Sequence, residues 1–135
     1  MSIKNWLIGL WKKKARRDPE STDGMRAETL AANYLRARGL VVVARNFRVR
    51  GGEIDLIVRE GEITVFVEVR LRRSRAFGGA IGSIGVQKRR RLLLAARHWL
   101  LRHPQHGNCR FDCVLLDGLN ANNLEWIRHA FTADD

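Results

Sequence analysis

Two stretches of the chain place hydrophobic residues at helical spacing and predict its main helices. The first follows Asp23, a candidate N-cap, and ends at Gly39, which predicts a helix over 24–38. The second follows Ser83, another candidate cap, and stops before Pro104, which predicts a helix over 84–102. The two apolar faces consist of Met25, Leu30, Ala31, Tyr34 and Leu35, and of Leu92, Leu93, Ala96, Trp99 and Leu100.

Alternating or β-branched apolar residues predict five strands, over 40–47, 53–58, 63–71, 110–116 and 124–131. A tight hairpin is expected at Glu60-Gly61, which would place Asp55 roughly opposite Phe66 on the next strand. The same alternation places Ile54 and Leu56 together on the other face from Asp55. The resulting order, α-β-β-β-α-β-β, predicts an α/β fold with a central mixed sheet flanked by helices.

Length and composition fit one globular domain. The chain has 135 residues, 45% of them hydrophobic, and no uninterrupted apolar run long enough to span a membrane. We expect a single domain over 23–135, preceded by a basic, partly amphipathic tail over 1–22. That tail has an apolar face followed by Lys and Arg, so membrane contact, nucleic-acid contact and a loosely ordered terminus all stay open. Its apolar residues are Ile3, Trp6, Leu7, Leu10 and Trp11.

The charge balance favours a polyanionic partner. Lys and Arg total 25 against 14 acidic residues, a formal net charge of +11, and such an excess attracts nucleic acid by long-range field and counterion release. Cys109 and Cys113 lie four residues apart in a predicted strand, about 13 Å in extended chain, which is beyond disulfide reach. Unpaired thiols and the lack of a secretory signal pattern lead us to expect a cytoplasmic protein.

Acidic residues recur on two of the predicted strands. Glu53 and Asp55 share one side of the first strand, and Glu68 and Arg70 share one side of its hairpin partner. Carboxylates flanked by apolar strand residues repel one another unless a cation or a proton offsets the charge. Mg²⁺ suits such a site, because it prefers oxygen ligands and uses one or two carboxylates together with substrate phosphate. A solvated strand face with a surface ion pair remains the simpler alternative.

Several short motifs resemble those of the YraN family, a group of small bacterial proteins similar to archaeal Holliday-junction resolvases and other PD-(D/E)xK nucleases. The resemblance covers about residues 24–131 and implies a restriction-endonuclease-like core. The motifs that carry it are Gly24-x₃-Glu28, Asn46-x-Arg48, the GEIDLI run from Gly52 to Ile57, the VFVEVR run from Val65 to Arg70 with Arg72, Arg73 and Ser74, Gly78-Gly79, Lys88, and the CRFD run from Cys109 to Asp112.

Carried over residue by residue, the resemblance implies that Asp55 and Glu68 are the paired metal ligands, with Glu28 completing the shell directly or through water. Arg70 stands where most active members of the superfamily have Lys. With these three acids it makes up the implied catalytic set, and Mg²⁺ or Mn²⁺ is the implied cofactor. Because a guanidinium stays protonated, Arg70 can hold a phosphate but cannot act as a neutral base. Arg89 follows Lys88 where the family tends to have Gln.

Two basic runs flank the acidic residues and are expected to contact nucleic acid. Their members are Arg72, Arg73, Arg75, Lys88 and Arg89. Few aromatic residues are interleaved with them, which favours contact with a duplex backbone over single-strand stacking.

Three functions therefore stand side by side. The favoured one is a Mg²⁺-dependent endonuclease acting on DNA, with duplex, branched or damaged DNA as candidate substrates. The alternatives are a nuclease-fold DNA-binding module that does not cut and a scaffold held at a membrane by its tail. The sequence also leaves a homodimer open.

Overall fold

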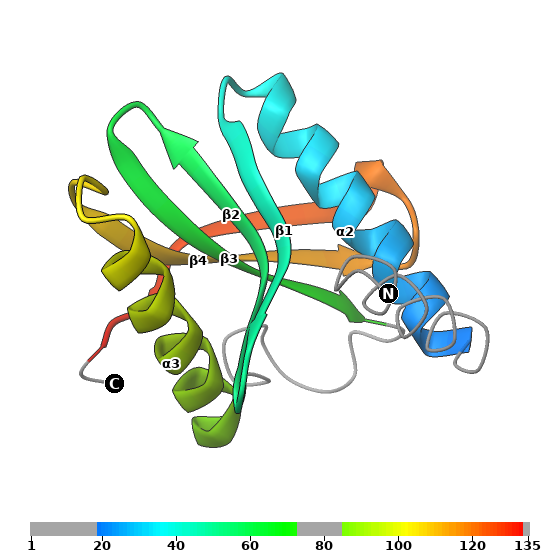
Figure 1. Cartoon of the computed structure of the whole chain (residues 1–135). Helices are drawn as coiled ribbons and strands as arrows, with labels where there is room; N and C mark the ends of the chain where they lie inside the picture. Colours follow the sequence, from blue (N-terminus) through cyan, green and yellow to red (C-terminus); the bar gives the residue numbers. More distant parts are fainter. Residues whose placement is uncertain (1–18, 73–84, 134–135) are drawn as a thin grey trace, which may run out of the picture.

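The computed structural model describes residues 19–72 and 85–133, which form one five-stranded sheet with two helices (Figure 1). The elements in chain order are α2 (Pro19–Ala37), β1 (Val41–Val49), β2 (Gly52–Glu60), β3 (Ile63–Arg72), α3 (Val86–Arg102), β4 (Cys109–Asp117), the short 3₁₀ helix η2 (Ala121–Asn123) and β5 (Leu124–Phe131). The strand order is β1-β2-β3-β4-β5. Only β3 and β4 pair in parallel, and α3 lies in the connection between them. The predicted mixed α/β architecture and element order are confirmed.

The two helices cover opposite faces of the sheet (Figure 1). Against α3 pack Ile57, Phe66, Phe111, Cys113 and Leu115, among others. The α2 face is lined by Leu56, Val58, Val65, Val67, Val114 and Leu116. Side chains therefore alternate between two separate cores along β3 and β4, as the sequence pattern predicts. Neither cysteine forms a disulfide, as expected. In the described part of the chain, no helix is long and apolar enough to cross a membrane.

The first helix begins five residues earlier than the pattern predicts. Pro19 is its first residue, and Asp23, the expected N-cap, lies inside it. Proline suits a first helical position because the N–H that it lacks would have no partner there. The predicted end is correct: Gly39 has a φ of 88°, and its N–H donates to Arg36 while that of Leu40 donates to Leu35. These two bonds satisfy the last carbonyls of the helix.

The hairpin between β2 and β3 is shifted relative to the expectation. Glu60 pairs with Ile63, so the turn consists of Gly61 and Glu62, and Gly61 takes the positive φ, 60°, that this tight turn needs. The placement of Asp55 opposite Phe66 was therefore wrong by two residues. Ile57 lies opposite Phe66, and the same register continued brings Asp55 level with Glu68.

Helix α3 lies very close to β2 at Gly52. A Cβ atom added at this glycine would meet the carbonyl oxygen of Arg91 at 2.5 Å and the amide nitrogen of Ala95 at 3.0 Å. No other residue type fits that separation without displacing the helix. This contact sets how near α3 comes to the sheet at Arg91 and Ala95.

Candidate functional site

Asp55 on β2 and Glu68 on β3 bring their carboxyl groups together between neighbouring strands. The backbone N–H of Val69 donates to Asp55 Oδ2 over 2.9 Å, and the Asp55 and Glu68 carboxyl groups lie close enough for each to shift the pKa of the other. Glu68 is only 2% exposed. Two buried carboxyl groups this close repel each other unless one carries a proton or a cation offsets the charge. The predicted convergence of these two residues is what the structure shows.

The environment of the pair opposes full ionisation. The pKa of Glu68 is raised to about 8, first by burial and next by the charge of Asp55, and Lys88 partly offsets this rise. Burial also raises the pKa of Asp55, against the lowering effects of the Val69 N–H and the Glu68 side chain. Without a cation, the pair therefore retains a proton near neutral pH. This is the electrostatic situation in which a bound cation would replace that proton.

Lys88 enters this site from the first turn of α3. Its Nζ lies 2.8 Å from Glu68 Oε1 in an ion pair. The contact lacks the directionality of a hydrogen bond, so Oε1 is a buried oxygen with no hydrogen-bond partner. The sequence placed Lys88 among the nucleic-acid contacts and did not predict that it touches an acidic residue of the site. The close approach of α3 to β2 at Gly52, beside Arg91 and Ala95, holds this helix near the same part of the sheet.

Glu28 faces the same region from α2 but does not join the pair. Asn46 Nδ2 donates to Glu28 Oε2 over 2.9 Å, and Arg45 lies 3.9 Å from the same oxygen. Burial, and next the charge of Asp55, raises the pKa of Glu28 to about 7. Within residues 19–72 and 85–133, no three acidic, histidine or cysteine side chains are grouped closely enough to hold a metal ion. Glu28 is thus placed to act on the pair through its charge or through water.

Asn46 is a residue of this site to which the sequence analysis assigned no role. It has a φ of 53°, which Asn tolerates better than most residues, and it lies between Arg45 and Phe47, the partners of Leu56 and Ile54. Asp55 is therefore across from it on β2. The regular alternation breaks at this point, because Ile54 packs in the α3 core and Leu56 in the α2 core. The prediction that these two side chains share a face was wrong, and the irregularity lies at the proposed site.

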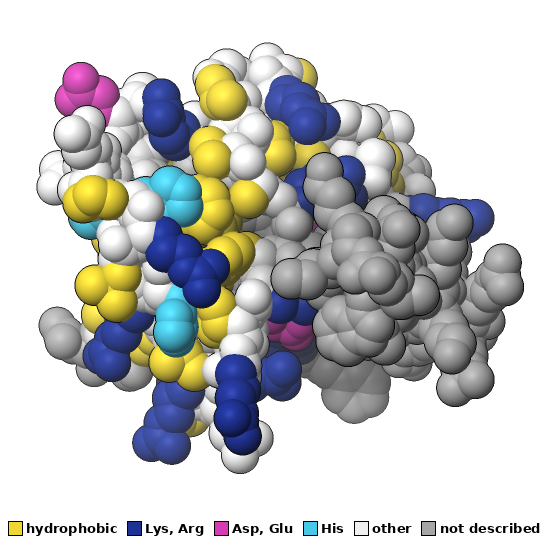
Figure 2. Space-filling model, viewed as in Figure 1, with side chains coloured by type: hydrophobic (Ala, Val, Ile, Leu, Met, Phe, Trp, Pro, Cys, Tyr) yellow, Lys and Arg dark blue, Asp and Glu magenta, His cyan; other side chains and the backbone are white. Residues whose placement is uncertain are grey.

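The residues expected to contact nucleic acid do not form one group in the described part of the chain. Arg72 donates to both carboxylate oxygens of Asp117, over 3.0 and 3.2 Å, and so joins the ends of β3 and β4. Arg73 and Arg75 lie outside the described residues. Arg89 is partly buried, and its Nε has no hydrogen-bond partner. Figure 2 shows many Lys and Arg side chains, with hydrophobic side chains and histidines between them, on the face seen in that view.

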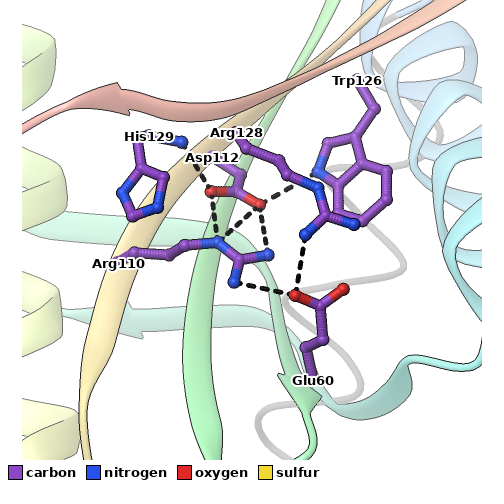
Figure 3. Close-up of polar contacts among 6 residues, drawn as sticks. All are labelled: Glu60, Arg110, Asp112, Trp126, Arg128 and His129. Carbon is purple, nitrogen blue, oxygen red and sulfur yellow. Dashed lines mark hydrogen bonds and ion pairs between the residues drawn. The ribbon is translucent and has the colours of Figure 1, made fainter.

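A second buried polar cluster surrounds Asp112 on β4 (Figure 3). Its carboxylate is fully buried and accepts hydrogen bonds from the Arg110 side chain, Trp126 Nε1 and the backbone N–H of His129. Glu60 accepts from both Arg110 and Arg128, each over 2.9 Å. Because the acceptors are occupied by protein donors, the cluster ties β2, β4 and β5 together and offers no open position for chemistry.

Fold and site together define a small α/β protein with a buried acidic pair and a lysine on one face of a mixed sheet. The chain belongs to the uncharacterised protein family UPF0102, whose sequence model matches residues 27–116. This confirms the resemblance to the YraN family. Among its relatives, a UPF0102 protein of Dechloromonas aromatica is 58% identical over 87% of this chain and 95% of its own length. Another, of Methylobacillus flagellatus, is 52% identical over 79% and 94%.

Proposed function

We propose that the protein is a Mg²⁺-dependent endonuclease that acts on DNA. The observation that carries the proposal is the meeting of Asp55, Glu68 and Lys88 at one point of the sheet. Two acids on neighbouring strands with a cationic side chain beside them match the PD-(D/E)xK plan that the sequence resembles. The net charge of +11 suits a polyanionic substrate.

The residues present fit a magnesium ion. Mg²⁺ commonly binds one or two carboxylates and keeps several water molecules, so a group of three protein ligands is not required. The proton retained by the pair is what a cation would displace, and the buried Glu68 Oε1, which now contacts the Lys88 ammonium, is the oxygen that it would reach. Asp55 and Glu68 would hold the ion. Bound there, it would stabilise charge developing on a phosphodiester and lower the pKa of a coordinated water.

The protein side chains have separate tasks in this reaction. A water oxygen forms a bond to phosphorus and the bond from phosphorus to the leaving sugar oxygen breaks. The proton lost by the attacking water passes through water to Glu28, and the leaving sugar oxygen takes a proton from solvent. The Val69 N–H fixes the Asp55 carboxylate, while Lys88 donates to the phosphate or to the attacking water. Arg70 remains protonated and stabilises phosphate charge. Glu28, with a pKa near 7, is suited to exchange a proton with water.

Cleavage of labelled branched, nicked and linear DNA by the purified protein, with Mg²⁺ or Mn²⁺, tests the proposal. Asp55→Asn and Glu68→Gln should each lower the rate hundreds-fold or more, since each removes metal-held charge stabilisation of several kcal/mol. Metal-free DNA binding should stay equal or tighten, because a repelling negative charge is lost. Glu125→Gln, at an exposed position of β5, is the matched control and should cut like wild type. Absence of metal-dependent turnover on every substrate would reject the enzyme.

A DNA-binding module that does not cut is the second candidate, and one observation favours it. Lys88 Nζ lies against Glu68 Oε1, so a protein ammonium already compensates the charge that a metal would compensate. The two candidates differ in whether any substrate is turned over with metal, while both require DNA binding.

A further inference from the structure

An open cleft of about 620 Å³ lies beyond the C-terminal end of α3, away from the acidic pair. Its walls come from β1, β2, the start of β3, the last turn of α3 and residues 104–107. Among the lining residues are Val43, Ile57, Arg59, Thr64, Trp99 and His103. The volume is within the range of small-molecule sites, and the wall combines apolar side chains with a few polar ones. None of these residues takes part in the site of Asp55 and Glu68.

Aromatic rings form one side of the cleft. The rings of Trp99 and His103 are stacked, with centroids 3.8 Å apart and an interplanar angle of 16°. Phe47 meets Trp99 edge-on at 5.2 Å, and the Nδ1 of His103 is bonded to the Trp99 carbonyl, so the stack is fixed in place. His103 itself is exposed. A fixed aromatic stack with an exposed outer member is a suitable surface for another planar ring.

The charges of the cleft favour an uncharged ring over an ion. Arg59 and Glu62 both line it and oppose each other in sign, and the other lining residues in the described chain are apolar, polar or histidine. Thr64 and Gln105 offer side-chain hydrogen-bonding groups. A nucleobase is such a ring, with polar edges and an apolar face.

The cleft and the acidic pair lie on the same side of the sheet. Ile57 lines the cleft and packs in the α3 core, and Lys88 and Trp99 belong to the same helix. Eleven residues separate Lys88 from Trp99, which is about 16 Å along the helix. That distance corresponds to roughly five stacked nucleotides of one DNA strand. The exposed Arg97 and Arg102 follow the same helix toward the cleft.

We propose that this cleft binds an unpaired nucleobase of a DNA strand whose phosphate lies at Asp55 and Glu68. The inference rests on the proposed function for the identity of the polymer, and it adds that the substrate carries unpaired bases a few nucleotides from the reacting phosphate. A forked or flapped duplex meets this requirement, and a fully paired duplex does not. The sparse aromatic content of the basic runs favoured duplex contact, but Trp99 and His103 supply a stacking surface outside those runs.

Fluorescence anisotropy in EDTA, where no cleavage occurs, tests the cleft. The probes are a labelled blunt duplex, the same duplex with a forked end, and the fork with abasic sites in its single-stranded arm. Wild type should bind the fork roughly tenfold more tightly than the blunt duplex, and abasic sites should remove that preference. His103→Ala should reduce the preference severalfold and leave affinity for the blunt duplex unchanged. Val43→Glu should reduce the preference at least as much, and its added negative charge should weaken binding of both probes only slightly. His98→Ala removes the same ring from α3 outside the cleft and should behave as wild type.

Equal binding of fork and blunt duplex, insensitivity to abasic sites, or an unchanged preference in both cleft variants would overturn the inference. So would a change of molecular mass in solution caused by Val43→Glu, since the cleft would then hold a second copy of the chain. Metal-dependent cutting of blunt duplex without any preference for forks would reject the cleft as a base site and leave the proposed nuclease standing. A preference for forks in a protein that never cuts would reject the proposed nuclease and leave the base site standing.

Discussion

Lys88 and Glu68 are in contact although twenty residues separate them, with Nζ 2.8 Å from Oε1. The contact brings the ammonium group of Lys88, on α3, to the carboxylate of Glu68, on β3. Arg70 lies two residues further along β3, at the position where most active members of the superfamily have lysine. Both nitrogen groups are therefore near the acidic pair. Burial raises the pKa of the Cys113 thiol on β4 to about 12, and the charges of Arg70 and Lys88 both oppose that rise. The structure thus offers two candidates for the cationic role in catalysis.

Replacing Lys88 tests whether it has that role. Lys88→Ala should lower the rate of DNA cleavage at least tenfold, because it removes a positioned proton donor beside the reacting phosphate. Arg90→Ala, at an exposed position two residues along the helix, should change the rate less than threefold and provides the matched control. The measurement is single-turnover cleavage with saturating protein. Equal rates in the two variants would exclude Lys88 from the reaction.

The Arg70→Lys variant tests whether the guanidinium group of Arg70 limits or supports DNA cleavage. If Arg70 is what limits activity, the lysine variant should cut faster than wild type, since it restores the common residue of the superfamily. If the site uses the guanidinium to clamp phosphate, the rate should fall, because lysine lacks the bidentate geometry. A wild type and a lysine variant that are both inactive with Mg²⁺ and with Mn²⁺ would favour the DNA-binding module.

The buried acid should make the metal-free protein less stable as the pH rises. The pKa of Glu68 is raised to about 8 in the folded protein, above its ordinary value of 4.5, so folding favours the protonated form. The stabilisation is complete below about pH 4.5 and is lost as the pH rises through 8. Glu68→Gln cannot ionise and should become more stable than wild type at pH 9 by about 2–4 kcal/mol, with a much smaller difference at pH 5.

Urea unfolding in EDTA at the two pH values measures this difference. Glu62→Gln, which alters an exposed acid of the neighbouring turn, controls for the loss of one negative charge. A constant difference between Glu68→Gln and wild type at pH 5 and pH 9 would contradict the raised pKa.

Asp112 should matter for stability and not for chemistry. Asp112→Ala leaves the largely buried Arg110 guanidinium without its main partner. Trp126 Nε1 and the His129 N–H also lose the oxygen atoms to which they donate. Breaking a buried charged network in this way costs about 3–5 kcal/mol. Glu125→Ala, on the exposed side of β5, should cost under about 0.5 kcal/mol. Wild-type stability of Asp112→Ala in thermal unfolding would show that the network contributes nothing.

The sequence predicted the architecture better than the details of the site. Hydrophobic periodicity was sufficient for both helices and all five strands, because each element buries one or two well-marked faces. It could not set the start of α2, since Pro19 is as compatible with a first helical turn as with a break. It also misplaced the β2–β3 register by two residues, because a glycine turn is equally compatible with neighbouring alignments until both strands are packed.

The acidic residues were found through the resemblance and the alternation, but their partners were not. Asn46 and Glu28 are eighteen residues apart, and nothing local predicts that they bond. Lys88 lies in a block of four cations, and helical periodicity alone does not indicate which of them reaches the sheet. The Asp112 network joins three strands, and such tertiary pairing leaves no periodic signal.

Gly52 determines how far α3 stands from the sheet. With only hydrogen at this position, the backbone of β2 meets that of α3 directly. A single methyl group would act as a spacer and push the helix out by roughly an ångström to restore ordinary contact distances. The lysine of the first turn would then no longer reach the acid on β3 in the same geometry. The absence of a Cβ atom at Gly52 thus fixes a helix-to-strand distance, and that distance determines whether the positive charge of Lys88 reaches the negative charge of Glu68.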